Sequence, residues 1–132
     1  MTQASALFHS LQLILPAALF ATMGAVALGR PRWVVGVFGG KADTKESRSE
    51  VRAVYGGFGL GTAMLLFSAH ALPPAMAQGA ALAVAVSSGG MALARAAAAC
   101  IERGQRLYPT WFFVFVEAGL AGSLARWALV PQ

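Results

Sequence analysis

The sequence has little charge. Only 11% of its 132 residues are Asp, Glu, Lys or Arg, against about 25% in an ordinary soluble domain. Hydrophobic residues make up 58% of the chain. A soluble domain of this size needs polar side chains to cover its outer surface, and this chain cannot supply them. The composition therefore excludes an ordinary soluble domain and indicates a protein whose surface is covered by lipid.

Two further absences narrow the classes of protein. Cys100 is the only cysteine, so no disulfide can form within the chain and no thiol pair is available for redox exchange. This excludes the thiol oxidoreductases that pass electrons to quinones. The segment "MTQASALFHS" has no Lys or Arg before the first apolar run, and that run is too long for the apolar part of a signal peptide. We expect it to remain in the mature protein.

Long apolar runs are what the sequence has instead. Four windows of about 20 residues are apolar enough to cross a bilayer as helices. They are residues 6–28, 53–72, 79–100 and 111–130. We predict an all-α fold, an integral membrane bundle of four antiparallel helices running up and down, in a single transmembrane domain of residues 1–132. Pro73 and Pro74 are expected to end the second helix.

The basic residues are distributed unevenly between the two ends of these helices. Nine of the ten Lys and Arg residues lie in or beside loops 29–52 and 101–110, and only Arg126 lies near the other end. The positive-inside rule places such loops in the cytoplasm. We therefore predict a multi-pass inner-membrane protein with both termini in the periplasm. Topology and anionic lipid head groups account for the basic residues, so no nucleic-acid partner is expected.

The first loop is the only long connection. Residues 33–38 are apolar but too short to span, so we expect them in the membrane interface with Trp33 at head-group level. The rest of this loop is interpreted as a charged turn exposed to solvent. Ser47 or Ser49 is expected to cap the second helix, because serine side chains accept hydrogen bonds from the free N–H groups of a helix start.

Arg95 and Glu117 lie inside predicted spans. At a rise of 1.5 Å per residue, Arg95 lies on the order of 12 Å from the second loop and Glu117 roughly 10 Å from it. An ionised side chain in hydrocarbon costs at least about 2.5 kcal/mol on insertion scales. We therefore predict that the two side chains, at matching depth on consecutive helices, face the interior and form an ion pair.

Arg52 and Tyr55 lie on one face of the second helix, toward the same side of the membrane. We predict that Arg52, Tyr55, Arg95 and Glu117 form one polar cluster, which is the candidate ligand-binding site. It is interpreted as an ion pair that fixes helix register, as a site for a phosphate or carboxylate, or as a catalytic site with Glu117 or Tyr55 as proton donor. No nucleophile–base pair or metal triad supports catalysis, so no catalytic residue is assigned and an enzymatic role stays open.

Two sets of small or polar residues are expected to line helix contacts. Glycines should allow the second and third helices to approach closely; the alternative is that they clear space beside Tyr55 for a ligand or lipid chain. These helix-packing residues are Gly56, Gly57, Gly61, Gly89 and Gly90.

On the third helix, a stripe of residues at helical spacing from Arg95 should face the interior of the bundle. It consists of Ser88, Met91, Ala99 and Glu102.

His9 and His70 both fall near the outer membrane surface, so a metal or haem site between the first two helices is one hypothesis. Two histidines without Cys, Asp or Glu on that side make a poor ligand set. No metal and no cofactor is therefore predicted. The expected partners are the lipid bilayer and either another membrane protein or a second copy of the chain.

The string "EVRAVYGGFGLG", with an arginine late in the third helix and a glutamate early in the fourth, resembles a bacterial family of small four-helix membrane proteins known only as domain of unknown function 4345. The resemblance covers most of the chain, and Arg-Ala-x-Tyr-Gly-Gly is its most specific part. The family-like positions are Arg52, Tyr55, Gly56, Gly57, Arg95 and Glu117. Members usually carry glycine where this chain has Ala94. The resemblance implies a four-helix bundle and no known activity.

The sequence thus predicts a small membrane protein that acts as a structural or interaction module or as an accessory subunit. The alternative is a membrane-embedded enzyme or binding protein for an amphipathic anionic ligand or lipid.

Overall fold

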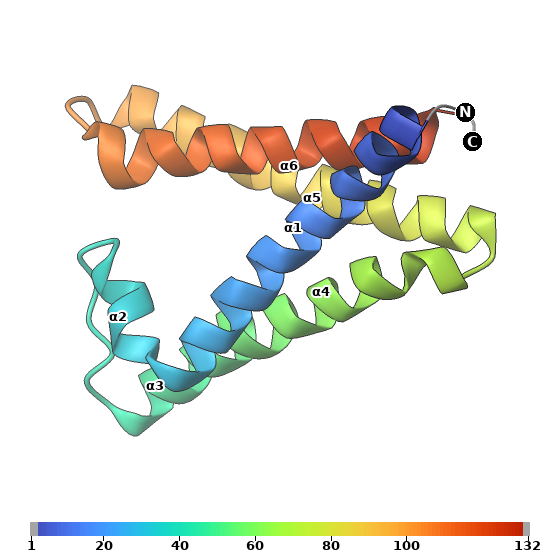
Figure 1. Ribbon diagram of the computed structural model, residues 1–132. Coiled ribbons are helices and arrows are strands. Elements are labelled where there is room, and N and C mark those ends of the chain that lie inside the picture. The colour runs from blue at the N-terminus through green and yellow to red at the C-terminus, as the bar shows by residue number, and fades with distance from the viewer. Residues whose placement is uncertain (1–2, 131–132) are drawn as a thin grey trace. The chain divides into compact units, whose positions relative to one another are not determined.

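The structure is a computed structural model and describes residues 3–130 (Figure 1). Every regular element in these residues is helical, which confirms the predicted all-α class. The elements in chain order are α1 (Gln3–Gly29), α2 (Pro31–Gly36), α3 (Lys45–Val51), the π-helical η1 (Arg52–Gly57), α4 (Phe58–Phe67), the 3₁₀ turn η2 (Ser68–Ala71), α5 (Pro74–Ile101), the π-helical η3 (Leu107–Trp111) and α6 (Phe112–Leu129).

Four helical segments are long and apolar enough to cross a membrane. They are Leu7–Gly29, Lys45–Ala71, Pro74–Ile101 and Leu107–Leu129. They correspond to the four windows expected from the sequence, so the chain is a multi-pass membrane protein whose helices contact lipid.

The second, third and fourth spans begin earlier than the sequence windows suggest. The second starts at Lys45, because Thr44 is the N-cap and its Oγ1 accepts a hydrogen bond from the Ser47 N–H at 3.0 Å. The expectation that Ser47 or Ser49 caps this helix was wrong. The third starts at Pro74, since proline fits the first position of a helix, where its missing N–H is not needed.

Contacts divide the chain into two compact units. The first contains residues 3–13 and 69–130, which include the start of α1 together with α5, η3 and α6. The second contains residues 14–68, which include the rest of α1 with α2, α3, η1 and α4.

In the first unit, α5 packs along α6. The buried face of α5 carries only small side chains. They are Ala77, Ala81, Ala85, Ser88, Ala92 and Ala99. Ser88 and Ala99 of the expected inward stripe are therefore buried, whereas Met91 and Glu102 are exposed. Small residues allow the two helix backbones to approach closely, and a Cβ placed on Gly89 would lie 3.6 Å from the Ala121 Cβ of α6.

In the second unit, α1 packs against η1 and α4 through glycines. A Cβ on Gly24 of α1 would lie 2.8 Å from the Leu60 backbone nitrogen and 2.9 Å from the Gly56 carbonyl oxygen. A Cβ on Gly59 would lie 3.1 Å from the Phe20 carbonyl oxygen. The two backbones are in direct contact here, which only glycine permits.

A small apolar core joins the end of α1 to α2 and α3. Ala27, Val34, Ala42 and Val51 are all buried and pack together, with Val35 against them. This core holds the short helix α2 and the segment around Ala42 in place beside α3. It consequently positions the charged side chains that alternate with the core residues in this part of the sequence.

The glycine contact between α1 and α4 generates the first prediction. Gly24→Ala forces the two backbones apart, and overpacking of this kind costs about 1–3 kcal/mol. We expect a lower midpoint of thermal unfolding, followed by circular dichroism in detergent. The matched control is Gly61→Ala, because a Cβ at Gly61 meets no described atom within 4 Å. Equal midpoints for the two variants would show that the glycine contact does not determine stability.

Candidate functional site

Arg95 and Glu117 are joined by a direct ion pair within the first unit. Arg95 lies in the last third of α5 and Glu117 in the first third of α6. The Arg95 Nε donates to both carboxylate oxygens of Glu117, at 2.9 Å to Oε1 and 3.0 Å to Oε2. Glu117 is only 6% exposed. An ionised carboxylate at this degree of burial requires a charged partner, and the structure supplies it from the neighbouring helix.

An aromatic ring on α6 covers the arginine of this pair. The guanidinium carbon of Arg95 lies 5.5 Å from the centroid of the Phe113 ring. Phe113 precedes Glu117 by four residues, so both side chains occupy one face of α6. Arg95 is thus held by the carboxylate and by the ring face, a contact that attracts cations electrostatically. The arrangement orders the side chain of Arg95 although part of it remains exposed.

The other two predicted site residues, Arg52 and Tyr55, belong to the second unit. Both lie in η1, where Arg52 Nε donates to the Leu28 carbonyl oxygen at 3.0 Å and Tyr55 is exposed. The structure therefore brings Arg95 and Glu117 together and gives Arg52 a partner at the end of α1. The meeting of all four residues in one cluster stays a prediction, because it joins two separate units.

The five predicted packing glycines differ in their surroundings. Gly56 lies against Leu28 of α1 and Gly89 lies against Ala121 of α6. A Cβ on Gly61 or Gly90 would meet no described atom within 4 Å, and one on Gly57 would approach only the carbonyl oxygen of its own helix at Arg52. Close approach of the second to the third helix lies between the two units and stays a prediction.

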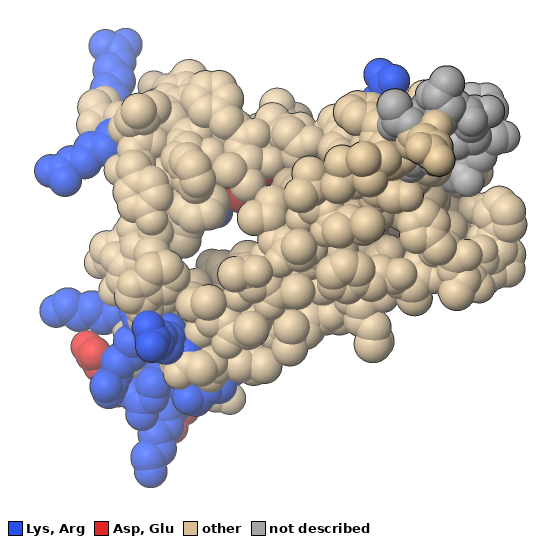
Figure 2. All heavy atoms as spheres, viewed as in Figure 1, with Lys and Arg blue, Asp and Glu red and all other residues tan. Residues whose placement is uncertain are grey.

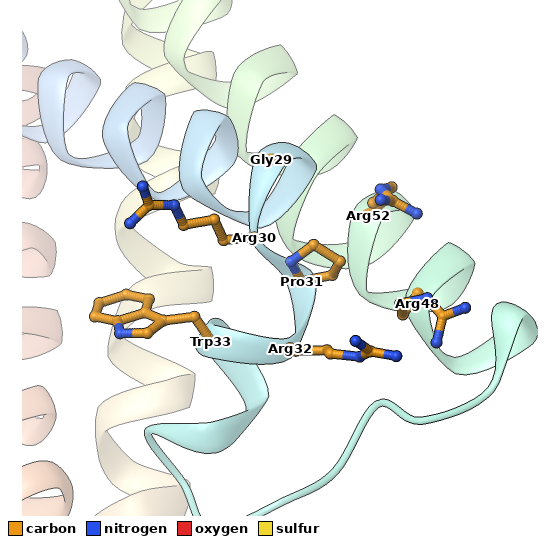
Figure 3. Close-up of a pocket in the computed structure, with 7 residues that line it drawn as sticks. All are labelled: Gly29, Arg30, Pro31, Arg32, Trp33, Arg48 and Arg52. Carbon is orange, nitrogen blue, oxygen red and sulfur yellow. The ribbon is translucent and has the colours of Figure 1, made fainter.

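A pocket of about 500 Å³ lies where α1 ends and α2 and α3 meet (Figure 3). Its charged lining residues are all arginines. They are Arg30, Arg32, Arg48 and Arg52. Figure 2 shows Lys and Arg side chains gathered over this end of α2 and α3. Sequence reasoning singled out Arg52 alone and assigned the other three to topology and to anionic lipid head groups. The string "RPRW" at the end of the first span was the available signal.

Backbone carbonyls hold three of these arginines. Arg32 Nε and Arg48 Nη1 both donate to the Ala42 carbonyl oxygen, each at 3.4 Å. Arg48 Nη1 also donates to the Asp43 carbonyl oxygen at 2.6 Å. The guanidinium groups of Arg32 and Arg48 therefore converge on one acceptor. Arg30 and Trp33 lie on the opposite side of Pro31 from Arg48 and Arg52 (Figure 3).

Both histidines lie beside Trp127 in the first unit. The His9 ring centroid is 5.4 Å from that of Trp127, and the His70 centroid is 6.4 Å from it. Trp127 is 2% exposed, so the two rings pack on a buried indole. Within residues 3–130 no group of three His, Cys, Asp or Glu side chains is placed to hold a metal ion. Sequence reasoning missed Trp127, although its position in the last span matches the depth of the histidines.

Comparisons with known proteins give one match. A family model described as a domain of unknown function, DUF4345, matches residues 9–129. No curated protein and no solved structure matches the chain. The family match spans both units, and it includes the Arg95–Glu117 pair and the arginine pocket.

The geometry of the ion pair generates the second prediction. Arg95→Met leaves the Glu117 carboxylate buried without its partner, and we expect a loss of about 3 kcal/mol in the free energy of unfolding. Arg95→Met combined with Glu117→Leu should recover most of this loss, because apolar residues of similar size replace a buried pair at little cost. Unfolding in a titration of mixed detergent micelles measures both values. The control is Arg103→Met, at an exposed arginine; an equal loss there would refute the role of the pair.

Proposed function

Since the chain belongs to the family described as domain of unknown function DUF4345, its function is inferred from its own residues, and we propose that it is a structural or interaction module of the bacterial inner membrane. In this proposal it works as an accessory subunit or as a small homo-oligomer. In its first unit, α5 packs along α6.

The observation that carries this proposal is the closed geometry of the Arg95–Glu117 pair. The single Nε of Arg95 serves both oxygens of Glu117, and Glu117 is buried. A carboxylate that is already neutralised in this way fixes the register of α5 against α6. A proton-coupled exporter needs a membrane glutamate that is free to exchange protons or substrate in turn. The partner arginine therefore favours a structural role over transport.

The outer faces of α5 and α6 supply the surface on which such a module contacts lipid or another protein. Val86 is 68% exposed and Leu93 is 73% exposed on α5, and Phe115 is 66% exposed on α6. Apolar side chains of this size stay exposed only where lipid or a partner helix covers them. A membrane protein partner and a second copy of this chain are both compatible with these faces.

The distribution of basic residues supports an orientation with both termini in the periplasm. The segment from Arg30 to Arg52 and the turn holding Arg103 and Arg106 carry most of the positive charge. The positive-inside rule places both in the cytoplasm.

The structural role predicts how the protein responds when the pair is replaced by apolar residues. The variant Arg95→Met/Glu117→Leu should insert into the membrane, keep its helical content and co-purify with the same lipids as the wild type, as measured by mass spectrometry of the extracted protein. A structural pair is replaceable in this way because its charges cancel each other. Loss of one specific bound molecule from a stable variant would contradict the proposal and favour a ligand-binding or catalytic pair.

The orientation predicts the behaviour of a reporter fused after residue 132. Alkaline phosphatase, which is active only in the periplasm, should be active at that position, and a fusion in the loop near Lys41 should be inactive. Green fluorescent protein, which fluoresces in the cytoplasm but not after export as an unfolded chain, provides the reciprocal control. A fluorescent fusion after residue 132 would reverse the proposed topology.

A further inference from the structure

The arginine pocket of the second unit has four arginines and no carboxylate among its lining residues. Within the described residues 3–130, none of Arg30, Arg32, Arg48 and Arg52 forms an ion pair with Asp or Glu. The hydrogen-bond partners of Arg32, Arg48 and Arg52 are backbone carbonyl oxygens, which carry no net charge. Like charges gathered at one place repel each other, so an anion in this pocket would be stabilised.

The fold gives the exposed Arg32 and the half-buried Arg48 a common anchor. Val34 and Val51 are buried in the core between α2 and α3, and Ala42 is 1% exposed beside them. The same Ala42 offers its carbonyl oxygen to both Arg32 and Arg48. The core therefore fixes the carbonyl oxygen on which the two guanidinium groups converge before any ligand arrives. Such preorganisation reduces the entropy that a ligand loses on binding.

Arg52 reaches the pocket from a π-helical segment. It is the first residue of η1, and its Nε ties that segment to the Leu28 carbonyl oxygen at the end of α1. Single π-helical turns inside α-helices are frequently found at functional sites. The segment between Lys45 and Phe67 is otherwise α-helical, so the irregular turn coincides with the residue that links the pocket to the first span.

The pocket lies at the end of a membrane span. The first span ends at Gly29, and the next residues line the pocket. Trp33 is 61% exposed beside them, and tryptophan is enriched at the level of lipid head groups. Basic pockets between membrane helices bind anionic lipid head groups. A pocket next to the end of a span is therefore expected at the level where lipid phosphate groups are concentrated.

We propose that this arginine pocket binds the phosphate of an anionic phospholipid head group from the adjacent leaflet. Arg32 and Arg48, which converge on Ala42, hold the phosphate oxygens through paired N–H groups, since the planar guanidinium matches phosphate geometry. Arg52 adds a third positive charge from the end of the second span. Arg30 and Trp33 line the other side of the pocket, where the head group meets the interface. This role goes beyond the structural module and does not depend on which side of the membrane the pocket faces.

The test measures lipid affinity of the full chain in nanodiscs. The wild type is titrated with phosphatidylglycerol against a background of phosphatidylcholine, and bound lipid is counted by native mass spectrometry. Arg32→Gln/Arg48→Gln should weaken retention of phosphatidylglycerol roughly tenfold or more, because glutamine removes the charge-assisted hydrogen bonds that each arginine donates to the phosphate. The matched control is Lys41→Gln/Lys45→Gln, which removes the same charge from the same loop at exposed lysines outside the pocket. Its retention should stay near that of the wild type.

The outcomes separate the possible sources of phosphate. Equal weakening in both double variants would overturn the proposal, because it would show a general charge effect. Displacement of the lipid by millimolar inorganic phosphate would overturn the assignment to a lipid head group in favour of a free anion. If Arg32→Gln/Arg48→Gln fails to fold, the same lipid retention is measured for Arg32→Lys/Arg48→Lys, which keeps the charge but loses the paired N–H geometry. Retention unchanged in that variant would also overturn the proposal.

Discussion

An ionised group inside a bilayer must have a partner, and the described structure depends on this constraint most clearly at Glu117. The chain has few charges, and this one lies buried within a membrane span. Arg95 neutralises it from the preceding helix with both carboxylate oxygens engaged. Because the two residues belong to consecutive helices, the pair determines how α5 and α6 align. The small buried residues of α5 then allow the close packing that this alignment requires.

The arginine pocket presents the opposite situation under the same electrostatic rule. Its arginines lie at the end of a span, where water and head groups screen charge, so the fold can leave them without carboxylates. The apolar core formed by Ala27, Val34, Ala42 and Val51 nevertheless gathers them in one place. One unit therefore contains a pair that is complete within the protein. The second unit contains positive charge that an anion from outside the protein can neutralise. The two sites divide the proposed roles of structure and lipid binding between different parts of the chain.

Sequence reasoning predicted the features that depend on composition and on the depth of a residue in the membrane. It failed for the features that are determined by local contacts between residues. The four spans and the Arg95–Glu117 pair followed from hydropathy and from the matching depth of two opposite charges. The start of the second span did not, because the choice of Thr44 over Ser47 as cap depends on backbone geometry. The pocket was missed for a similar reason: only the packing of Val34 against Ala42 and Val51 brings arginines separated in sequence to one carbonyl.

The ion pair by which Arg95 and Glu117 neutralise each other joins the two helices of the α5–α6 hairpin. Solid-state NMR tests it most directly, through the dipolar coupling between ¹⁵N-labelled arginine Nε and the ¹³C-labelled glutamate carboxyl carbon in protein reconstituted into lipid bilayers. Assignment comes from the loss of the signal in Glu117→Gln. We expect a strong coupling, because the Arg95 Nε donates to the Glu117 Oε1 at 2.9 Å. A coupling too weak for direct contact, with Arg95 and Glu117 in separate surroundings, would contradict it.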